Sequence, residues 1–280
     1  DTTFYPDKGR ERIKAMIETR PDWCVSRQRV WGVPLPIFVH KKTKEILVDE
    51  EVNENIASIY EKEGSDCWFS DNPQRFLGNK YKAEDYNKTS DIVEVWFDSG
   101  CTHSFVLEKR KDLQWPASMY LEGSDQHRGW FHSSLLESCG TRGRAPYESI
   151  LSHGFVVDGK GFKMSKSLGN VIAPEDILKK YGADILRIWV ASSNYEEDLR
   201  IDFSILEQHA DSYRKIRNTF RYLLGNLNDE FVKIDLENLD LNEFPELEQY
   251  MLHKIYELNK NFKNYFKSYD FHNLYKELLN

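Results

Sequence analysis

Residues 149–178 read SILSHGFVVDGKGFKMSKSLGNVIAPEDIL and combine three segments of different character. Residues 149–157 are mostly apolar, which is typical of a strand that is buried on both faces of a parallel sheet. A polar loop rich in glycine and lysine follows over residues 158–170. Pro174 then suits the first turn of a helix, which the apolar spacing extends to Trp189. This order of strand, loop and helix predicts an α/β fold with a parallel sheet.

Further elements are predicted on the N-terminal side of this stretch. We expect a helix over residues 9–20, a hairpin within residues 34–48, strands over residues 91–97 and 119–121, and a helix over residues 128–138. Strands and helices thus alternate along this part of the chain, as they do in a parallel α/β sheet.

Beyond Ser204 the sequence becomes helical. Apolar residues step by threes and fours over residues 206–227, which predicts one long amphipathic helix. The same pattern predicts a second helix from residue 248 to residue 279, after a polar connection. We therefore expect an α/β domain over residues 1–204 and the start of a helical bundle over residues 205–280.

The composition suits a soluble globular protein. Of the 280 residues, 40% are hydrophobic and 30% are charged. No apolar run is long enough to cross a bilayer, and the charged N-terminal stretch lacks the core of a signal peptide. We therefore expect a cytoplasmic protein. The net charge of −8 argues against a protein that coats nucleic acid through bulk charge, although it is compatible with a local basic face.

The cysteines and histidines do not form a metal-binding pattern. The four cysteines, Cys24, Cys67, Cys101 and Cys139, lie far apart and include no C-x-x-C pair. A zinc knuckle or a redox dithiol requires closely spaced ligands, so the sequence predicts neither of them. Isolated thiols are typical of a reducing compartment, where most of them fill space in the interior.

The polar loop carries the residues best suited to chemistry. Lys163 and Lys166 are interleaved with Ser165 and Ser167, and the loop follows a buried strand. Parallel sheets bind ligands at the carboxyl ends of their strands, and lysine offers a compact charge on a flexible stem for phosphate oxygens. Two lysines in a loop are usually no more than part of a solvated surface, so the spacing alone does not separate the two interpretations.

Two nucleotide-binding motifs compete with this interpretation of the loop. Gly154, Gly159 and Lys160 nearly match a P-loop, but Gly161 replaces the hydroxyl residue that binds magnesium. Gly154 also lies inside the expected strand, whereas the glycines of a P-loop follow the strand. No G-x-G-x-x-G occurs, so a nicotinamide-dependent dehydrogenase has no support.

Residues 163–167, KMSKS, resemble the signature loop of the class I aminoacyl-tRNA synthetases. The resemblance implies the C-terminal half of a Rossmann-like (HUP) nucleotide-binding fold followed by a helical bundle. It also implies adenylate formation, in which an amino-acid carboxylate attacks the α-phosphate of ATP and pyrophosphate leaves. Lys163 and Lys166 would then be catalytic, with Lys166 the more critical, and Ser165 would assist ATP binding. Removing one such donor typically costs on the order of 10²–10³ in rate.

Three further segments narrow the branch of the family. Residues 21–36 (PDWCVSRQRVWGVPLP) resemble a block shared by the isoleucine, valine and leucine enzymes, and its Arg-Val-Trp-Gly ending favours isoleucine. Residues 91–103 (DIVEVWFDSGCTH) and 121–131 (LEGSDQHRGWF) resemble the isoleucine enzymes. The valine enzymes are the runner-up within the family, and Asp98-Ser99-Gly100 together with Gln126-His127 argue against them.

The resemblance assigns roles to residues that would bind the isoleucyl-adenylate and its precursors. Trp96 and Trp130 would line the isoleucine pocket, Glu122 and Gln126 would hold the amino group and the adenylate, Asp125 and Gly123 would lie near the sugar, and His153 and Gly154 would lie close to the adenosine. Without the family context, a single tryptophan usually belongs to the core and a glutamate at a strand end is usually solvated. The motif context reverses these odds most clearly for Glu122, Gln126, Trp130 and Lys166.

The resemblance also implies partners. The expected ones are tRNA(Ile), L-isoleucine and ATP, with Mg²⁺ accompanying ATP and without a zinc site or a membrane in this segment. The helix after residue 205 carries Arg214, Lys215, Arg217 and Arg221. Such a basic run is usually a solvated face, but the family places tRNA against this region, so phosphate contact is a second interpretation. We expect the complete enzyme to be monomeric.

The second signature of the family, H-x-G-H, does not occur in the chain, whose eight histidines stand at positions 40, 103, 127, 132, 153, 209, 253 and 272. The editing domain of the family has no counterpart in the chain either. The chain begins at Asp1, and its first residues read like the interior of a domain. We therefore expect a piece of a longer ligase that does not catalyse adenylation alone. A paralogue that binds tRNA or nucleotide without catalysis is the alternative.

Overall fold

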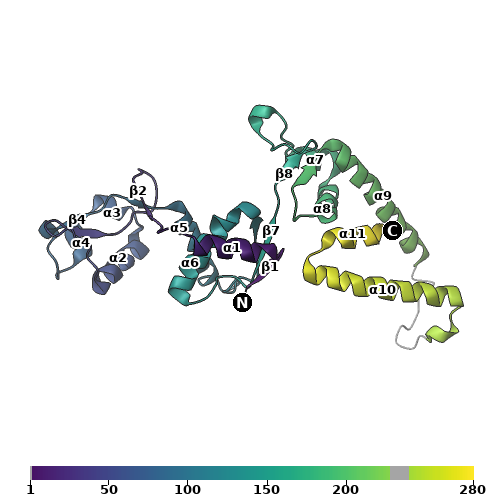
Figure 1. Ribbon diagram of the computed structural model, residues 1–280, viewed down its shortest axis with the longest axis horizontal. Helices are drawn as coiled ribbons and strands as arrows, with labels where there is room; N and C mark the ends of the chain where they lie inside the picture. The colour runs from purple at the N-terminus through teal and green to yellow at the C-terminus, as the bar shows by residue number, and fades with distance from the viewer. Residues whose placement is uncertain (1, 228–239) are drawn as a thin grey trace. The chain divides into compact units, whose positions relative to one another are not determined.

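The computed structural model describes residues 2–227 and 240–280 (Figure 1). The chain divides into two compact units, each of which contains segments from separate parts of the sequence. Unit 1 contains Asp1–Thr3, Lys8–Tyr120 and Asp125–Ile150, and unit 2 contains Phe4–Asp7, Leu121–Ser124 and Leu151–Asn280. None of the described helices combines the length and the hydropathy that a bilayer-spanning segment requires.

A three-stranded sheet has the order β1-β7-β6, with β1 over Thr3–Tyr5, β7 over Ser149–His153 and β6 over Tyr120–Gly123. The strand expected at residues 119–121 is therefore confirmed as β6. The central strand β7 is largely buried, and Ile150 is completely shielded from solvent. Its three inner residues are buried although only Ile150 and Leu151 among its five residues are apolar, as expected of a central strand covered on both faces.

The strand predicted over residues 149–157 is wrong in one respect, because it is two strands. β7 ends at His153, and β8 (Val156–Asp158) begins after a break at Gly154. Here the Gly154 N–H donates to the Tyr195 carbonyl over 2.8 Å, and a Cβ at this position would lie 2.2 Å from the Glu197 carbonyl oxygen. β8 pairs in parallel with β9 (Leu199–Ile201), so the break moves the chain from one sheet to another.

In unit 1 the helices α1 (Lys8–Glu18) and α6 (Trp130–Arg142) confirm the helices expected at residues 9–20 and 128–138. The strand expected at residues 91–97 is only partly correct. β5 (Ile92–Val93) pairs with β2 (Ser26–Arg27), and the chain then turns into α5 (Val95–Gly100). A side-chain oxygen of Glu94 accepts the Trp96 N–H over 3.0 Å, which caps the helix and ends the strand. A π-helical turn, η2 (His103–Leu107), follows α5.

A second part of unit 1 has a hydrophobic core of its own. Its elements are β3 (Phe38–His40), α2 (Glu50–Glu63), α3 (Cys67–Ser70), α4 (Pro73–Leu77), the 3₁₀ turn η1 (Ala83–Asp85) and β4 (Tyr86–Lys88). The core contains Phe38, Val52, Ile56, Ile59, Trp68, Phe76 and Leu77. The hairpin expected within residues 34–48 is present as a bridge between Val39 and Ile46, and β3 also pairs with β4.

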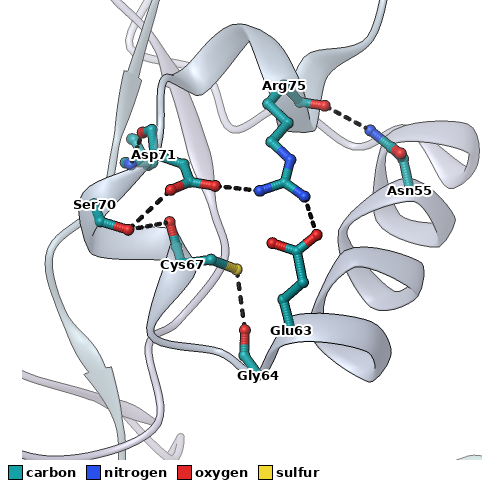
Figure 2. A network of polar contacts seen from close by, with 8 residues as sticks. Asn55, Glu63, Gly64, Cys67, Ser70, Asp71 and Arg75 are labelled. Atoms are coloured by element: carbon teal, nitrogen blue, oxygen red, sulfur yellow. Dashed lines mark hydrogen bonds and ion pairs between the residues drawn. The ribbon is translucent and has the colours of Figure 1, made fainter.

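Polar contacts fasten the three helices of this part to one another (Figure 2). The guanidinium of Arg75 pairs with the carboxylates of Glu63 and Asp71. Asn55 donates to the backbone oxygen of Arg75 over 2.9 Å, and Ser70 donates to Asp71 over 2.9 Å. Hydrogen bonds to Glu63 and Asp71 raise the pKa of Arg75 above its usual range, so the guanidinium is charged at neutral pH. Because these side chains are partly exposed, the ion pairs should contribute little to the free energy of unfolding.

Unit 2 contains the lysine loop and the helices that follow it. The helices are α7 (Pro174–Tyr181), α8 (Ala183–Ser192), α9 (Phe203–Asn226), α10 (Glu246–Ser268) and α11 (Phe271–Leu279), with the 3₁₀ turns η4 (Lys166–Leu168) and η5 (Leu241–Glu243). The core is formed by Ile177, Ile185, Trp189, Leu199, Ile201, Leu206 and Ala210. The long helix expected at residues 206–227 is confirmed as α9.

Two expected helices of unit 2 are each broken into two. The helix from Pro174 to Trp189 is interrupted at Gly182, whose φ of +82° favours glycine. The helix expected from residue 248 to residue 279 breaks at Tyr269, whose φ is +57°, before α11. Both α9 and α11 pack against α8, so unit 2 includes residues from both sides of the expected boundary at residue 204. That domain boundary stays a prediction.

Candidate functional site

The candidate site residues belong to both compact units. Unit 1 contains Trp96, Asp125, Gln126 and Trp130, and unit 2 contains Glu122, Gly123, His153, Gly154, Lys163, Ser165 and Lys166. The structure therefore defines two local groups. Trp96 and Trp130, with Gln126 beside them, form an aromatic group, also called the aromatic wall below. Lys163 and Lys166 belong to a basic group, the lysine loop.

Trp130 is the most firmly held residue of the aromatic group. Its indole ring stacks on Tyr120, with a centroid separation of 4.0 Å and an interplanar angle of 7°. Its ring N–H donates to the Ser99 carbonyl over 2.9 Å, which ties the start of α6 to α5. Burial raises the pKa of Tyr120 to about 12, so the stacking partner is neutral in the physiological range. These contacts fix both the position and the tilt of the Trp130 ring.

Gln126 is held between Trp130 and Asp125. Its side-chain oxygen accepts the backbone N–H of Trp130 over 3.0 Å, and its side-chain nitrogen donates to an Asp125 carboxylate oxygen over 3.0 Å. A Cβ at Gly129 would lie 2.5 Å from the Gln126 oxygen and 2.9 Å from the Trp96 ring. The absence of a side chain at Gly129 therefore lets Gln126 and Trp96 approach each other.

Trp96 lines a small cavity of about 130 Å³. Other residues of its wall are Trp23, whose ring Arg20 covers at 4.8 Å, and the buried carboxylate Glu94. Arg27 lies 3.9 Å from Glu94. Trp23, Arg27 and Glu94 are not among the predicted site residues, although they lie within the segments at residues 21–36 and 91–103. Trp130 does not line this cavity, so a pocket shared by the two tryptophans stays a prediction.

Three acidic residues, Glu94, Asp98 and Glu137, lie at or beside α5. The Cys101 thiol donates to one oxygen of Glu137 over 2.9 Å. The other oxygen of Glu137 is buried and has no hydrogen-bond partner among the described residues. Burial, with a further contribution from Asp98, raises the pKa of Glu137 to about 7. Burial also raises the pKa of Asp98, and Glu94 adds to that shift.

Glu122 and Gly123 end strand β6. Glu122 is exposed, and no ion pair involves it within the described residues, whereas Gly123 is buried. An exposed carboxylate at the carboxyl end of a strand is suited to a substrate ammonium group. His153 is half-buried at the end of β7, and its Nδ1 lies 2.7 Å from the Gly154 carbonyl oxygen.

The lysine loop presents charge outward and an apolar anchor inward. Lys163 and Lys166 are both exposed, whereas Met164 between them packs against the hydrophobic core of unit 2. The Ser165 hydroxyl accepts the Leu168 N–H over 3.3 Å and lies 3.1 Å from the Ser167 hydroxyl, so it caps η4. No ion pair involves either lysine among the described residues. Both ammonium groups are therefore available to an external anion.

The basic residues of α9 are exposed as expected. Arg214 pairs with Asp211 one turn earlier on the same helix. Lys215, Arg217 and Arg221 form no ion pair within the part of the chain that the structure describes. Within the same part, no group of three or more His, Cys, Asp or Glu side chains could hold a metal ion.

The sequence matches a known class of enzyme. The family model described as tRNA synthetases class I (I, L, M and V) matches residues 1–202. The chain therefore belongs to the class I tRNA synthetases, and the resemblance to this family is confirmed.

Sequence relatives identify the branch of this class. The chain is 91% identical over its full 280 residues to the isoleucine–tRNA ligase of Pelagibacter ubique and covers 31% of that protein. It is 54% identical over 260 residues, 93% of this chain, to the isoleucine–tRNA ligase of Zymomonas mobilis, of which it covers 27%. The resemblance to the isoleucine enzymes is confirmed, and the valine alternative is not favoured. The chain spans less than a third of the length of these relatives.

Solved structures agree on the fold. Methionyl-tRNA synthetase of Mycobacterium tuberculosis in complex with methionyl-adenylate superposes with a TM-score of 0.61 and 18% identity, covering 99% of this chain and 46% of that one. The Agrobacterium radiobacter K84 LeuRS–tRNA–LeuAMS complex superposes with a TM-score of 0.53 and 20% sequence identity, and the match covers 75% of this chain and 30% of that one. The expected Rossmann-like α/β fold with a helical C-terminal part is thereby confirmed.

Proposed function

We propose that this chain is the segment of an isoleucine–tRNA ligase that supplies the lysine loop and the aromatic wall for isoleucine activation. The reaction would join L-isoleucine and ATP into isoleucyl-adenylate and then transfer isoleucine to tRNA(Ile). The observation that carries the proposal is the lysine loop, in which two exposed lysines flank a methionine anchored in the core. A fixed backbone with free ammonium groups is suited to an anion that changes its charge distribution during a reaction.

The chemistry assigned to the loop is electrostatic. The isoleucine carboxylate attacks the α-phosphate of ATP, and the bond to the leaving pyrophosphate breaks. Lys163 and Lys166 would donate to the phosphate oxygens on which negative charge builds up. Ser165, His153, Gly154 and Asp125 are proposed ATP-binding residues. Mg²⁺ would arrive bound to the oxygens of ATP, as part of the substrate.

The aromatic group would select the amino acid. Trp96 and Trp130 supply rigid apolar surfaces for the isoleucine side chain, and Glu122 and Gln126 would hold its amino group, with Gly123 near the sugar. An apolar pocket binds isoleucine in preference to valine by a free-energy difference of only about 1–3 kcal/mol, the contribution of one methylene group, and isoleucine enzymes are the usual illustration of this limit. We therefore propose that fidelity in the complete enzyme depends on a further hydrolytic domain.

The remaining proposals concern the rest of the enzyme. Arg214, Lys215, Arg217 and Arg221 would contact phosphates of tRNA(Ile), since they are exposed on one helix. Residues 1–204 would form the C-terminal half of the catalytic domain, and residues 205–280 would begin the anticodon-binding domain. We further propose a cytoplasmic, monomeric complete enzyme.

The test is a chimera in which this chain replaces the matched segment of the Pelagibacter ubique enzyme. We expect isoleucine-dependent ATP–pyrophosphate exchange, and Lys166→Ala should lower its kcat by about 10²–10³. Lys160→Ala is the matched control, because Lys160 is exposed in the same loop but lies outside the KMSKS segment. Equal losses in both variants, or none in Lys166→Ala, would contradict the proposed role and favour a paralogue that binds without catalysis.

The substrate assignment and the dependence on other segments are tested separately. The chimera should prefer isoleucine to valine in kcat/KM by about 10–200-fold. The purified 280-residue chain alone should show no exchange, because H-x-G-H is absent from it. Exchange by the isolated chain would contradict this expectation.

A further inference from the structure

Asp158 closes the first half of the lysine loop. One of its carboxylate oxygens accepts the backbone N–H groups of Lys160 and Phe162 over 3.0 and 2.8 Å. Its other oxygen accepts the side-chain amide of Asn170 over 2.8 Å. One side chain therefore binds the beginning of the loop and, twelve residues later, its end.

Asn170 closes the second half of the loop. Its side-chain oxygen accepts the Ser165 N–H over 2.9 Å. Its side-chain nitrogen, besides donating to Asp158, donates to the Lys163 carbonyl over 3.3 Å. Asn170 thus contacts the backbone at Lys163 and at Ser165, the residue before Lys166.

We propose that Asp158 and Asn170 form a clasp that sets the positions from which Lys163 and Lys166 reach the ATP phosphates. Both are positioning residues that act through the loop backbone. This inference rests on the function proposed above and deepens it. The hydrogen bonds to Asn170 and to the Phe162 N–H lower the pKa of Asp158, so it is ionised and accepts all three bonds at neutral pH.

The surroundings of the clasp explain why it can hold the loop. Gly159 approaches Asp202 so closely that a Cβ there would lie 2.0 Å from the Asp202 carboxylate. Asp202 in turn caps α9 by accepting the Ile205 N–H over 2.7 Å. Met164 fastens the middle of the loop to the core of unit 2. With its ends and its middle fixed, the backbone leaves mainly the lysine side chains free to move.

The chemistry of the pair provides a sharp test. Asn170→Asp would place two carboxylates against each other, and Asp158→Asn would place two amide donors there, so each change breaks the clasp. The double variant Asp158→Asn with Asn170→Asp exchanges donor and acceptor and restores the bond between the two side chains. It also keeps an acceptor for the Ser165 N–H and loses only the donor to the Lys163 carbonyl.

In the chimera, Asn170→Asp should lower kcat/KM for ATP about 10–100-fold, since misplacing a catalytic group by about 1 Å costs on this order. The KM for isoleucine should not change. The double variant should regain activity to within a few-fold of the parent. An unchanged Asn170→Asp enzyme, or a double variant no more active than the single ones, would overturn the clasp.

Hydrogen exchange in the 280-residue chain tests the clasp without relying on catalysis. The Ser165 N–H should exchange faster in Asn170→Asp and regain its protection in the double variant, whereas unchanged protection would overturn the inference. If the parent chimera lacked isoleucine-dependent exchange, the proposed function would fail, and this measurement would still report on the clasp. Circular dichroism of each variant shows whether the fold is retained.

Discussion

The aromatic wall of unit 1 and the lysine loop of unit 2 are held in opposite ways. In the wall, the functional side chains themselves are fixed, as in Trp130, which stacks on Tyr120 and donates to the Ser99 carbonyl. In the loop, hydrogen bonds fix the backbone, and the charged ends of Lys163 and Lys166 are exposed. The difference matches the ligands proposed for the two regions.

A side chain of constant shape is best recognised by a rigid surface, because a preorganised wall loses little conformational entropy on binding. Phosphate groups that gain negative charge and then leave are better bound by flexible lysine side chains that extend from a fixed backbone. The two regions should therefore respond differently to substitution. In the wall, stability and activity should fall together, whereas in the loop activity should fall alone.

The largest expected effect on stability is that of Trp130→Ala. The substitution removes the stack on Tyr120 and the bond to Ser99, so the free energy of unfolding of the 280-residue chain should fall by about 3 kcal/mol. Lys166→Ala should leave that free energy within about 0.5 kcal/mol of the parent, because the side chain is exposed. Urea titration followed by fluorescence and circular dichroism measures both values.

Trp31→Ala is the matched control for Trp130→Ala. Trp31 belongs to the same unit but is 93% exposed, so its removal should change stability little. Equal losses from the two tryptophans would show that the stack and the Ser99 bond contribute nothing particular. A large loss of unfolding free energy in Lys166→Ala would contradict the expectation that substitutions in the lysine loop lower activity without lowering stability.

The sequence predicts the lysine loop and most of the flanking elements because they depend on local patterns. The apolar run before the loop, Pro174 after it and the spacing of apolar residues in α9 are all visible over a few turns. The helices between residues 50 and 77 are not among the predicted elements, although Asp49 as a cap and the spacing of Val52, Ile56 and Ile59 indicate α2.

Other features depend on contacts between distant residues. The break at Gly154 follows from its close approach to Glu197, and the clasp joins side chains twelve positions apart. The helix at residues 95–100 begins because Glu94 caps it, in a segment whose apolar residues favour a strand. The family resemblance supplied the candidate residues of the site, but not Trp23, Glu94 or Glu137, whose importance depends on burial.

An intermediate effect is expected from Glu137, which supports the wall from beneath. Its pKa is raised to about 7, so the folded chain keeps this proton to a higher pH than the unfolded chain does. The favourable contribution is therefore complete below about pH 4.5 and is lost as pH rises through 7. Because solvent reaches part of the side chain, the loss should be on the order of 1 kcal/mol.

Glu137→Gln should remove this loss, since glutamine does not titrate. The stability difference between variant and parent should shift in favour of the variant between pH 5 and pH 8 in urea titrations. The difference between variant and parent reports Glu137 together with its coupling to Asp98, whose pKa is also raised by burial. Glu148→Gln, a change at an exposed glutamate of the same unit, should retain the parental dependence. If the stability difference between Glu137→Gln and the parent stayed constant with pH, Glu137 would not be the group that makes the stability of this region depend on pH.

The smallest expected effect tests whether α9 behaves like the lysine loop. Arg217 is exposed and has no ion pair within the described residues, whereas Arg214 pairs with Asp211. If both contact phosphates of tRNA, Arg217→Ala should reduce the slope of log Kd against log salt by about 0.7–0.9, and the affinity should fall a few-fold. Arg214→Ala should change the slope less, because Asp211 already offsets its charge. Filter binding of tRNA to the chimera at several salt concentrations measures both slopes. Equal slopes for the parent and both variants would mean that Arg214 and Arg217 do not contact tRNA phosphates and only keep this face of α9 solvated.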